Sequence, residues 1–166
     1  MHSVEFGPRR FLTRVVIEVG PDKHHAALPK LPEGGGREEL IRAIKGAGLW
    51  PLFKQRPLGK MPVGEAAPAA IFVNGMDSAP LAADPCFATH DRPADLQAGV
   101  DVLARLTDGA VYLALRDAGD HQSDARGLDG VEVHDFDGPH PAGLVGTHIH
   151  EIQPLKSGEV AFAISL

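Results

Sequence analysis

The chain has 166 residues, with 16 Lys and Arg against 22 Asp and Glu, and a formal net charge of -6 at pH 7. This length predicts one domain that buries roughly 70% of its unfolded surface, and the acidic balance argues against sequence-independent binding to nucleic-acid phosphates. No apolar run approaches the ~18 to 20 residues of a membrane span, the first ten residues lack the core of a secretion signal, and the single cysteine, Cys86, excludes an internal disulfide. We therefore expect a soluble cytoplasmic chain, or a soluble piece of something larger.

The first half of the chain predicts one strand and one helix, separated by loops. Residues 11–19 are rich in β-branched side chains, which is typical of a strand. Residues 20–36 contain three prolines and a Gly-Gly-Gly triplet, which indicates a loop. Residues 38–47 place apolar side chains on one helical face, and Gly48 is positioned to end the helix. Four prolines in residues 49–68 leave little room for regular structure.

The second half predicts a helix between buried strands. Residues 70–74 and 111–115 are short apolar runs without polar alternation, as in strands buried on both faces. Residues 92–107 are predicted to form a helix with Pro93 in its first turn. Residues 131–136 form a third strand candidate, and residues 160–166 a final strand whose edge we expect to be unpaired.

The helices and strands alternate along the chain in the manner of βαβ crossover units. This order predicts an α/β fold of three layers with a mainly parallel sheet. The sequence contains no internal repeat.

Nucleotide binding is the first function that an α/β chain suggests. The sequence contains neither G-x-G-x-x-G nor a Walker loop, the patterns that bring backbone N–H groups to a phosphate. The triplet at residues 34–36 does precede a helix, but Glu38 and Glu39 place two carboxylates at the positive end of that helix. We expect these carboxylates to repel a phosphate.

A histidine-rich stretch near the end of the chain suggests metal binding. On a strand, His148 and His150 would point to the same face, with His140 close in sequence. Such imidazoles can ligate zinc, which would make the chain a metal-dependent hydrolase. No Glu or Cys completes a recognised spacing, and Asp135 or Asp137 would have to fold back to serve. The alternative is that the imidazoles bond to loop backbone and hold the turns together.

Nucleophilic catalysis has little support in the sequence. Cys86 lies four residues before His90, but isolated cysteines are more often inert than reactive. No serine lies in a G-x-S-x-G context.

A local strip of basic and aromatic residues interrupts the acidic chain. Its composition fits an acidic partner or lipid headgroups, or else a solvated loop whose aromatic side chains dock on the sheet. The strip consists of Lys45, Trp50, Phe53, Lys54, Arg56 and Lys60.

Two blocks carry a resemblance to a known family. Residues 71–85 read Ile-Phe-Val-Asn-Gly-Met-Asp-Ser-Ala-Pro-Leu-Ala-Ala-Asp-Pro, and residues 135–150 read Asp-Phe-Asp-Gly-Pro-His-Pro-Ala-Gly-Leu-Val-Gly-Thr-His-Ile-His. Both closely resemble the subunit designated A of the bacterial Na+-translocating NADH:quinone oxidoreductase. Further matches at residues 6–19, 48–62 and 99–115 follow in the family's order, so the resemblance covers almost the whole chain.

The resemblance implies a division into domains. Residues 1–20 look like the end of an N-terminal lipoyl-like, barrel-sandwich domain, and residues 21–36 like a linker. Residues 37–166 look like a three-layer Rossmann-like domain related to the NADH-binding flavoprotein subunit of complex I. The family's later domains are absent, which implies a C-terminally truncated Rossmann-like domain in a fragment, in a truncated gene or in a non-functional relic.

The resemblance also implies a function within a complex. Family members are peripheral subunits on the cytoplasmic face of the inner membrane, in a translocase that passes electrons from NADH to ubiquinone and exports Na+. By resemblance, the partners are the other subunits, the membrane is reached only through them, and no nucleic acid is involved. The family's subunit is not known to carry a cofactor, since flavins and iron–sulfur centres lie on other subunits. We expect the isolated chain to be inactive.

The sequence offers a physical reason for a missing cofactor. In the complex I relative, the corresponding loop is rich in glycine and wraps the flavin and nicotinamide phosphates. Residues 50–60 of this chain contain bulky side chains, two prolines and only Gly59, so few backbone amides are free to bind a phosphate. A flavin- or NADH-binding domain of the complex I type is therefore the alternative rather than the first choice.

The family's link to quinone suggests a last set of candidates. A quinone headgroup needs apolar walls with one or two hydrogen-bond donors. Leu144 and Val145 would supply the walls. Four polar side chains beside them are the candidate donors: His140, Thr147, His148 and His150.

Overall fold

The computed structural model describes residues 2–20, 27–32, 34–63, 67–117 and 124–166. Near the N-terminus, β1 (Ser3–Phe6) and β2 (Leu12–Val16) pair antiparallel in a sheet of their own, and the 3-10 helix η1 (Pro8–Arg10) joins them. Strand β2 lies inside the predicted strand 11–19. Strand β1, with four residues, is too short for its alternation to be recognised.

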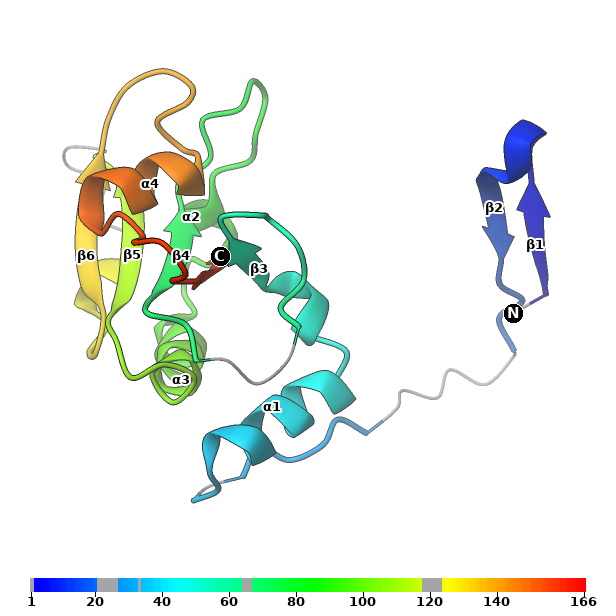
Figure 1. Ribbon diagram of the computed structural model, residues 1–166, viewed down its shortest axis with the longest axis horizontal. Helices are drawn as coiled ribbons and strands as arrows, with labels where there is room; N and C mark the ends of the chain where they lie inside the picture. The colour runs from blue at the N-terminus through cyan, green and yellow to red at the C-terminus, as the bar shows by residue number, and fades with distance from the viewer. Residues whose placement is uncertain (1, 21–26, 33, 64–66, 118–123) are drawn as a thin grey trace.

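The second sheet has five strands in the order β3-β7-β4-β5-β6 (Figure 1). Strands β7, β4, β5 and β6 run parallel, and β3 is antiparallel to β7. The four parallel strands have the Rossmann order: β5 and then β6 lie on one side of the first strand, β4, and the last strand, β7, lies on the other side of β4. The predicted α/β fold with a mainly parallel sheet is confirmed. The strands are β3 (Lys54–Arg56), β4 (Ile71–Gly75), β5 (Val111–Arg116), β6 (Glu132–Phe136) and β7 (Ala161–Ser165).

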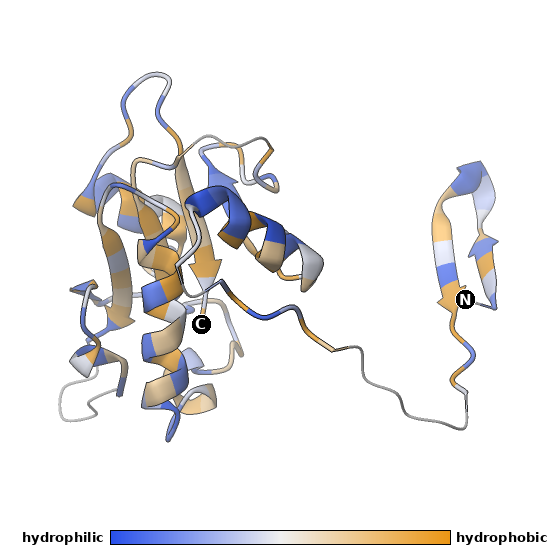
Figure 2. Ribbon diagram, turned by 90° about the horizontal axis from the view of Figure 1, so that it is seen from below, coloured by the Kyte–Doolittle hydropathy of each residue, from blue (hydrophilic) through white to orange (hydrophobic). Residues whose placement is uncertain are grey.

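Helices flank the sheet and complete the predicted three layers (Figure 1). Helix α1 (Arg37–Gly46) precedes the sheet, α3 (Pro93–Ala104) connects β4 to β5, and α4 (Val145–Ile152) connects β6 to β7. Figure 2 shows that the central strands are largely hydrophobic, whereas the helices mix hydrophilic and hydrophobic residues. Each helix thus offers one apolar side to the sheet. Three short elements complete the fold: η2 (Trp50–Leu52), α2 (Pro85–Ala88) and η3 (Asp124–Gly127).

Strand β4 separates two cores, because successive side chains of a strand point to opposite faces. Ile71 and Val73 belong to the larger core, which α1 and α3 complete. Phe72 belongs to the smaller core, with Ile149 of α4. A fully buried side chain of this size contributes about 1.5–3 kcal/mol, so the uninterrupted apolar run stabilises both layers.

Residues 49–63 are more ordered than their prolines predict. Trp50 and Phe53 are only 4% and 3% exposed, with ring centroids 5.3 Å apart. Both rings meet Phe162 of β7 edge-on, at 6.0 and 6.2 Å. The indole Nε1 donates to the Pro62 carbonyl at 3.0 Å. The interpretation in which these two aromatic side chains dock on the sheet is confirmed, and the described part of this segment holds two elements of three residues each, η2 and β3, despite its prolines.

Strand β7 also differs from its prediction. We expect an unpaired edge there, but β7 pairs with β4 on one side and with β3 on the other. Strand β3, which lies about a hundred residues before β7 in the chain, pairs with this edge. No local pattern around β7 could indicate that pairing.

Candidate functional site

The carboxyl ends of β4 and β7 mark the point where the strand order reverses. In open α/β sheets, ligands bind in the crevice at this point, because the neighbouring connections leave toward opposite faces. The two blocks that carry the family resemblance, residues 71–85 and 135–150, meet on this side of the sheet. The loop that follows β4 contacts the loop that precedes α4.

Three hydrogen bonds join the loop before α4 to the end of β4 and the loop that follows it, and a fourth holds the Asn74 side chain in place. Asn74 Nδ2 donates to the Gly143 carbonyl at 3.1 Å, while its Oδ1 accepts from the Met76 amide at 3.0 Å. Ser78 Oγ accepts from the Gly143 amide at 2.9 Å and lies 3.1 Å from His140 Nδ1. Both backbone groups of Gly143 are therefore held by side chains of the neighbouring loop.

Gly143 has to be a glycine for steric reasons. A Cβ at this position would lie 2.4 Å from the Ser78 amide nitrogen and 2.8 Å from Ser78 Oγ. The backbone nitrogen cannot move aside as a flexible side chain can, so any other residue would separate the two loops.

The structure separates the histidines that the sequence places together. Residues 145–152 form helix α4, in which residues two apart point to nearly opposite sides. His148 is accordingly 1% exposed and stacks on Phe136 at 4.4 Å, whereas His150 is exposed. The expectation that His148 and His150 share a face is wrong, because it assumes a strand.

His148 and Thr147 bond to loop backbone. His148 Nε2 lies 2.8 Å from the Ala142 carbonyl, and Thr147 Oγ1 donates to the Pro141 carbonyl at 3.1 Å. His140 is exposed and contacts Ser78. The interpretation in which these side chains hold the turns together agrees with these contacts.

Burial disfavours the charged form of the His148 imidazole. Loss of solvent lowers its pKa from the usual 6.5, and the hydrogen bond to Ala142 opposes this shift. With the proton on Nε2, Nδ1 is a buried acceptor, and it has no hydrogen-bond partner among the described residues. Protonation of Nδ1 would bury a positive charge against Phe136.

The predicted metal ligands do not converge. Among the described residues, His140, His148 and His150 form no group of donors within reach of one ion. Asp135 is engaged instead by Arg126, which bonds to both of its carboxylate oxygens. That hydrogen bond lowers the pKa of Asp135. A hydrolase built on these histidines finds no support in this geometry.

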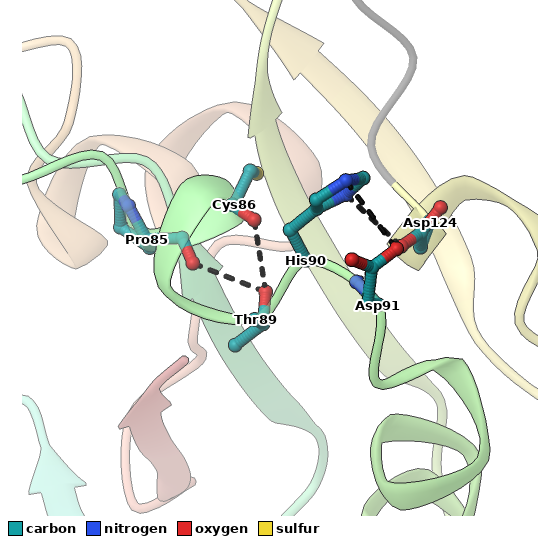
Figure 3. A network of polar contacts seen from close by, with 6 residues as sticks. All are labelled: Pro85, Cys86, Thr89, His90, Asp91 and Asp124. Carbon is teal, nitrogen blue, oxygen red and sulfur yellow. Dashed lines mark hydrogen bonds and ion pairs between the residues drawn. The ribbon is translucent and has the colours of Figure 1, made fainter.

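Another group of donors lies on the surface (Figure 3). His90 Nε2 is 3.4 Å from Asp91, His90 Nδ1 is 3.4 Å from Asp124, and the Asp91 amide donates to Asp124 at 3.0 Å. These contacts join two segments more than thirty residues apart, so no sequence spacing indicates them. All three residues are exposed, and exposed acidic groups are common without a bound ion. Cys86 donates its thiol to the Gly75 carbonyl rather than to His90, so no nucleophile–base pair forms.

The residues near the helices do not fit a dinucleotide. Glu38 and Glu39 lie in the first turn of α1, and the Glu39 carboxylate folds back over Gly35. An apolar groove of about 380 Å³ lies between α1, α3 and the sheet, and among the described residues that line it only Asp95 and Ser165 are polar. A pyrophosphate requires several N–H donors or cations, and this groove offers a carboxylate.

The basic residues of the strip have different surroundings. Lys45 Nζ lies 5.3 Å above the Trp50 ring, and Lys54 Nζ donates to the Pro51 carbonyl at 3.3 Å. Lys60 is exposed, and Arg56 is half-buried. Within the described residues, no helix is long and apolar enough to pass through a bilayer.

Comparison with known proteins gives a consistent result. A family model described as the NqrA second alpha/beta domain matches residues 36–166. The chain is 37% identical over 166 residues to the Na(+)-translocating NADH-quinone reductase subunit designated A of Neisseria gonorrhoeae (strain NCCP11945), which covers 98% of this chain and 37% of the relative. The same subunit of Hahella chejuensis (strain KCTC 2396) is 38% identical over 169 residues, covering 98% and 36%. That of Vibrio parahaemolyticus serotype O3:K6 (strain RIMD 2210633) is 39% identical over 169 residues, also covering 98% and 36%. The chain spans little more than a third of the length of these relatives.

Proposed function

The chain belongs to the family of the NqrA second alpha/beta domain, and on that premise we propose that it acts as part of the NqrA subunit of a Na(+)-translocating NADH-quinone reductase. Its role there is peripheral: it supports electron transfer from NADH to ubiquinone, coupled to Na+ export, from the cytoplasmic face of the membrane. Contact with the membrane runs through the other subunits. The match over residues 36–166, which contain the whole five-stranded sheet, is the observation that carries this proposal.

The proposal includes a division of the chain. Residues 1–20 are the end of a lipoyl-like domain, residues 21–36 a linker, and residues 37–166 a Rossmann-like domain. Two observations support this division. Strands β1 and β2 form a sheet separate from the other five strands, and the family match begins at Gly36, next to helix α1.

The proposed role is structural and quinone-associated, without a cofactor held by this chain. The buried side chains of Trp50 and Phe53 support this view, because they lie where a glycine-rich loop would be needed to cradle a phosphate. A flavin absorbance near 450 nm in purified protein would contradict it.

For the quinone, the exposed side of residues 138–150 is the candidate region. His140 and His150 are accessible there beside Leu144, which is 47% exposed. Thr147 and His148 would act by holding the loop in place, since their polar atoms bond to backbone. A ubiquinone photoaffinity probe should label this region, and labelling confined to other segments would refute the assignment.

Assembly is the direct test of the main proposal. In a host that carries the other subunits, the full subunit containing this segment should co-purify with them from membranes. Replacing the segment 36–166 by an unrelated domain should abolish both co-purification and NADH-dependent quinone reduction. Normal assembly and activity with the segment replaced would contradict the proposal.

A further inference from the structure

The guanidinium of Arg56 lacks a counter-charge among the described residues. Arg56 ends strand β3 and is half-buried. Its Nε is closed off from solvent and, within that same part of the chain, has no hydrogen-bond partner. No ion pair between described residues includes it. Since acidic residues outnumber basic ones by 22 to 16, a cation without an acidic partner among the described residues is unusual in this chain.

The same guanidinium lies against the first turn of helix α4. A Cβ on Gly146 would be 3.3 Å from Arg56 Nη2, and a Cβ on Gly59 would be 3.4 Å from Nη1. Two positions without a side chain therefore border the cation. A cation next to a helix N-terminus is electrostatically unfavourable, because both are positive. An anion placed between them would be attracted by both.

The first turn of α4 offers donors of its own. The residue before the helix is Leu144, which cannot cap it with a side chain. The Ala142 carbonyl is taken by the His148 side chain. In the described part of the chain, the N–H groups of Val145 and Gly146 have no acceptor.

The surroundings of Arg56 favour a protein over a small anion. Arg56 lies on an edge strand of the sheet, where another chain can approach. The same loop exposes three large apolar side chains: Leu58 at 74%, Met61 at 47% and Val63 at 72%. Arginine among apolar residues is typical of protein interfaces, whereas phosphate sites are lined by polar groups.

We propose that Arg56 and the N–H groups of Val145 and Gly146 bind a carboxylate from an acidic segment of a partner protein, with the exposed apolar residues of this loop around the contact. The planar guanidinium matches a carboxylate in bidentate geometry. This inference rests on the proposed function, because it names the surface through which the chain meets another subunit.

The first test uses the 15N-labelled full chain and a synthetic peptide, acetyl-Leu-Glu-Glu-Leu-amide. The peptide should shift the Gly146 amide and the Arg56 Nε–H resonances saturably, with affinity falling as NaCl rises. Arg56→Gln should weaken binding at least about ten-fold. Arg42→Gln removes the same charge from an exposed position on α1 and should change affinity less than about two-fold.

Three results would overturn the inference. The first is equal binding of a peptide with Gln in place of Glu, and the second is unchanged affinity in Arg56→Gln. The third is saturation of the same two resonances by inorganic phosphate at lower concentration than by the peptide, which would indicate a small-ligand site.

The second test places both substitutions in the full subunit within its complex. Arg56→Gln should reduce co-purification with the other subunits, whereas Arg42→Gln should leave it unchanged. If the wild-type subunit does not co-purify, the proposed function fails while the peptide result stands. If Arg56→Gln co-purifies as the wild type does, the inference about Arg56 alone is refuted.

Discussion

Replacing Gly143 by alanine should detach the loop before α4 from the end of β4. The added Cβ would lie 2.4 Å from the Ser78 amide nitrogen, 2.8 Å from its Oγ and 3.0 Å from its Cβ. A backbone atom cannot yield, so the loop has to withdraw. Withdrawal breaks the bond from the Gly143 amide to Ser78, the bond from Asn74 to the Gly143 carbonyl, and the contact of His140 with Ser78.

The expected loss of stability follows from these three contacts. A hydrogen bond contributes about 0.5–1.5 kcal/mol net, so Gly143→Ala should lower the free energy of unfolding by roughly 2–4 kcal/mol. Urea unfolding followed by circular dichroism measures this difference. Faster hydrogen exchange at residues 142–148 would show whether the loop opens locally before the sheet unfolds.

Gly99→Ala is the matched control. Gly99 is exposed in the middle of α3, and a Cβ there would meet nothing within 4 Å. Alanine is favoured over glycine in a helix by about 0.5–1 kcal/mol, so this variant should be more stable than the wild type. The steric argument fails if Gly143→Ala falls within about 0.5 kcal/mol of the wild type.

Three individual side-chain environments give further predictions. The pKa of His148 in the folded chain lies below its usual 6.5. As the pH falls, the unfolded chain therefore binds a proton before the folded chain does, so the contribution of His148 to the free energy of unfolding should be level above about pH 6.5 and fall below it. Urea titrations from about pH 8 to about pH 5 should lose this fall in His148→Gln but keep it in His150→Gln. Trp50→Ala should cost about 3–5 kcal/mol in the same unfolding assay, because the ring is buried against the core, and a cost below about 1 kcal/mol would contradict that packing. Arg126 and Asp135 are 29% and 45% exposed, so a double-mutant cycle should give a coupling of about 1 kcal/mol or less that weakens in salt; a coupling independent of salt would be the contrary result.

The central strands could be predicted from sequence because neither face of them is open to solvent. Residues 71–75 and 111–115 are all buried or half-buried, so their apolar runs carry the information locally. Strand β3 (Lys54–Arg56) could not be predicted, since its partner β7 lies about a hundred residues later and its own sequence is polar. Helix α4 could not be predicted from the sequence either. With eight residues it is too short for a clear helical period, and its glycine and histidines favour a turn.

The position of the candidate site could be predicted from the sequence, but the roles of its residues could not. Residues 71–85 and 135–150 were identified by resemblance, and the fold brings them together. The role of His148 depends on its place in helix α4, whereas the spacing of His148 and His150 suggests a strand. The basic strip includes Arg56, but the lack of a counter-charge among the described residues becomes visible only when α4 is placed against β3.

The aromatic residues of the 50–60 loop connect stability to the proposed loss of a cofactor. Trp50 and Phe53 pack on Phe162, so they belong to the larger core and not merely to a surface loop. Glycines at these two positions would clear the side chains from the space that a phosphate needs, but each would also remove an aromatic side chain at about 3–5 kcal/mol. Two such losses are comparable to the whole stability of a domain, about 5–15 kcal/mol. Phosphate binding at this loop would therefore require a new core as well as a new loop.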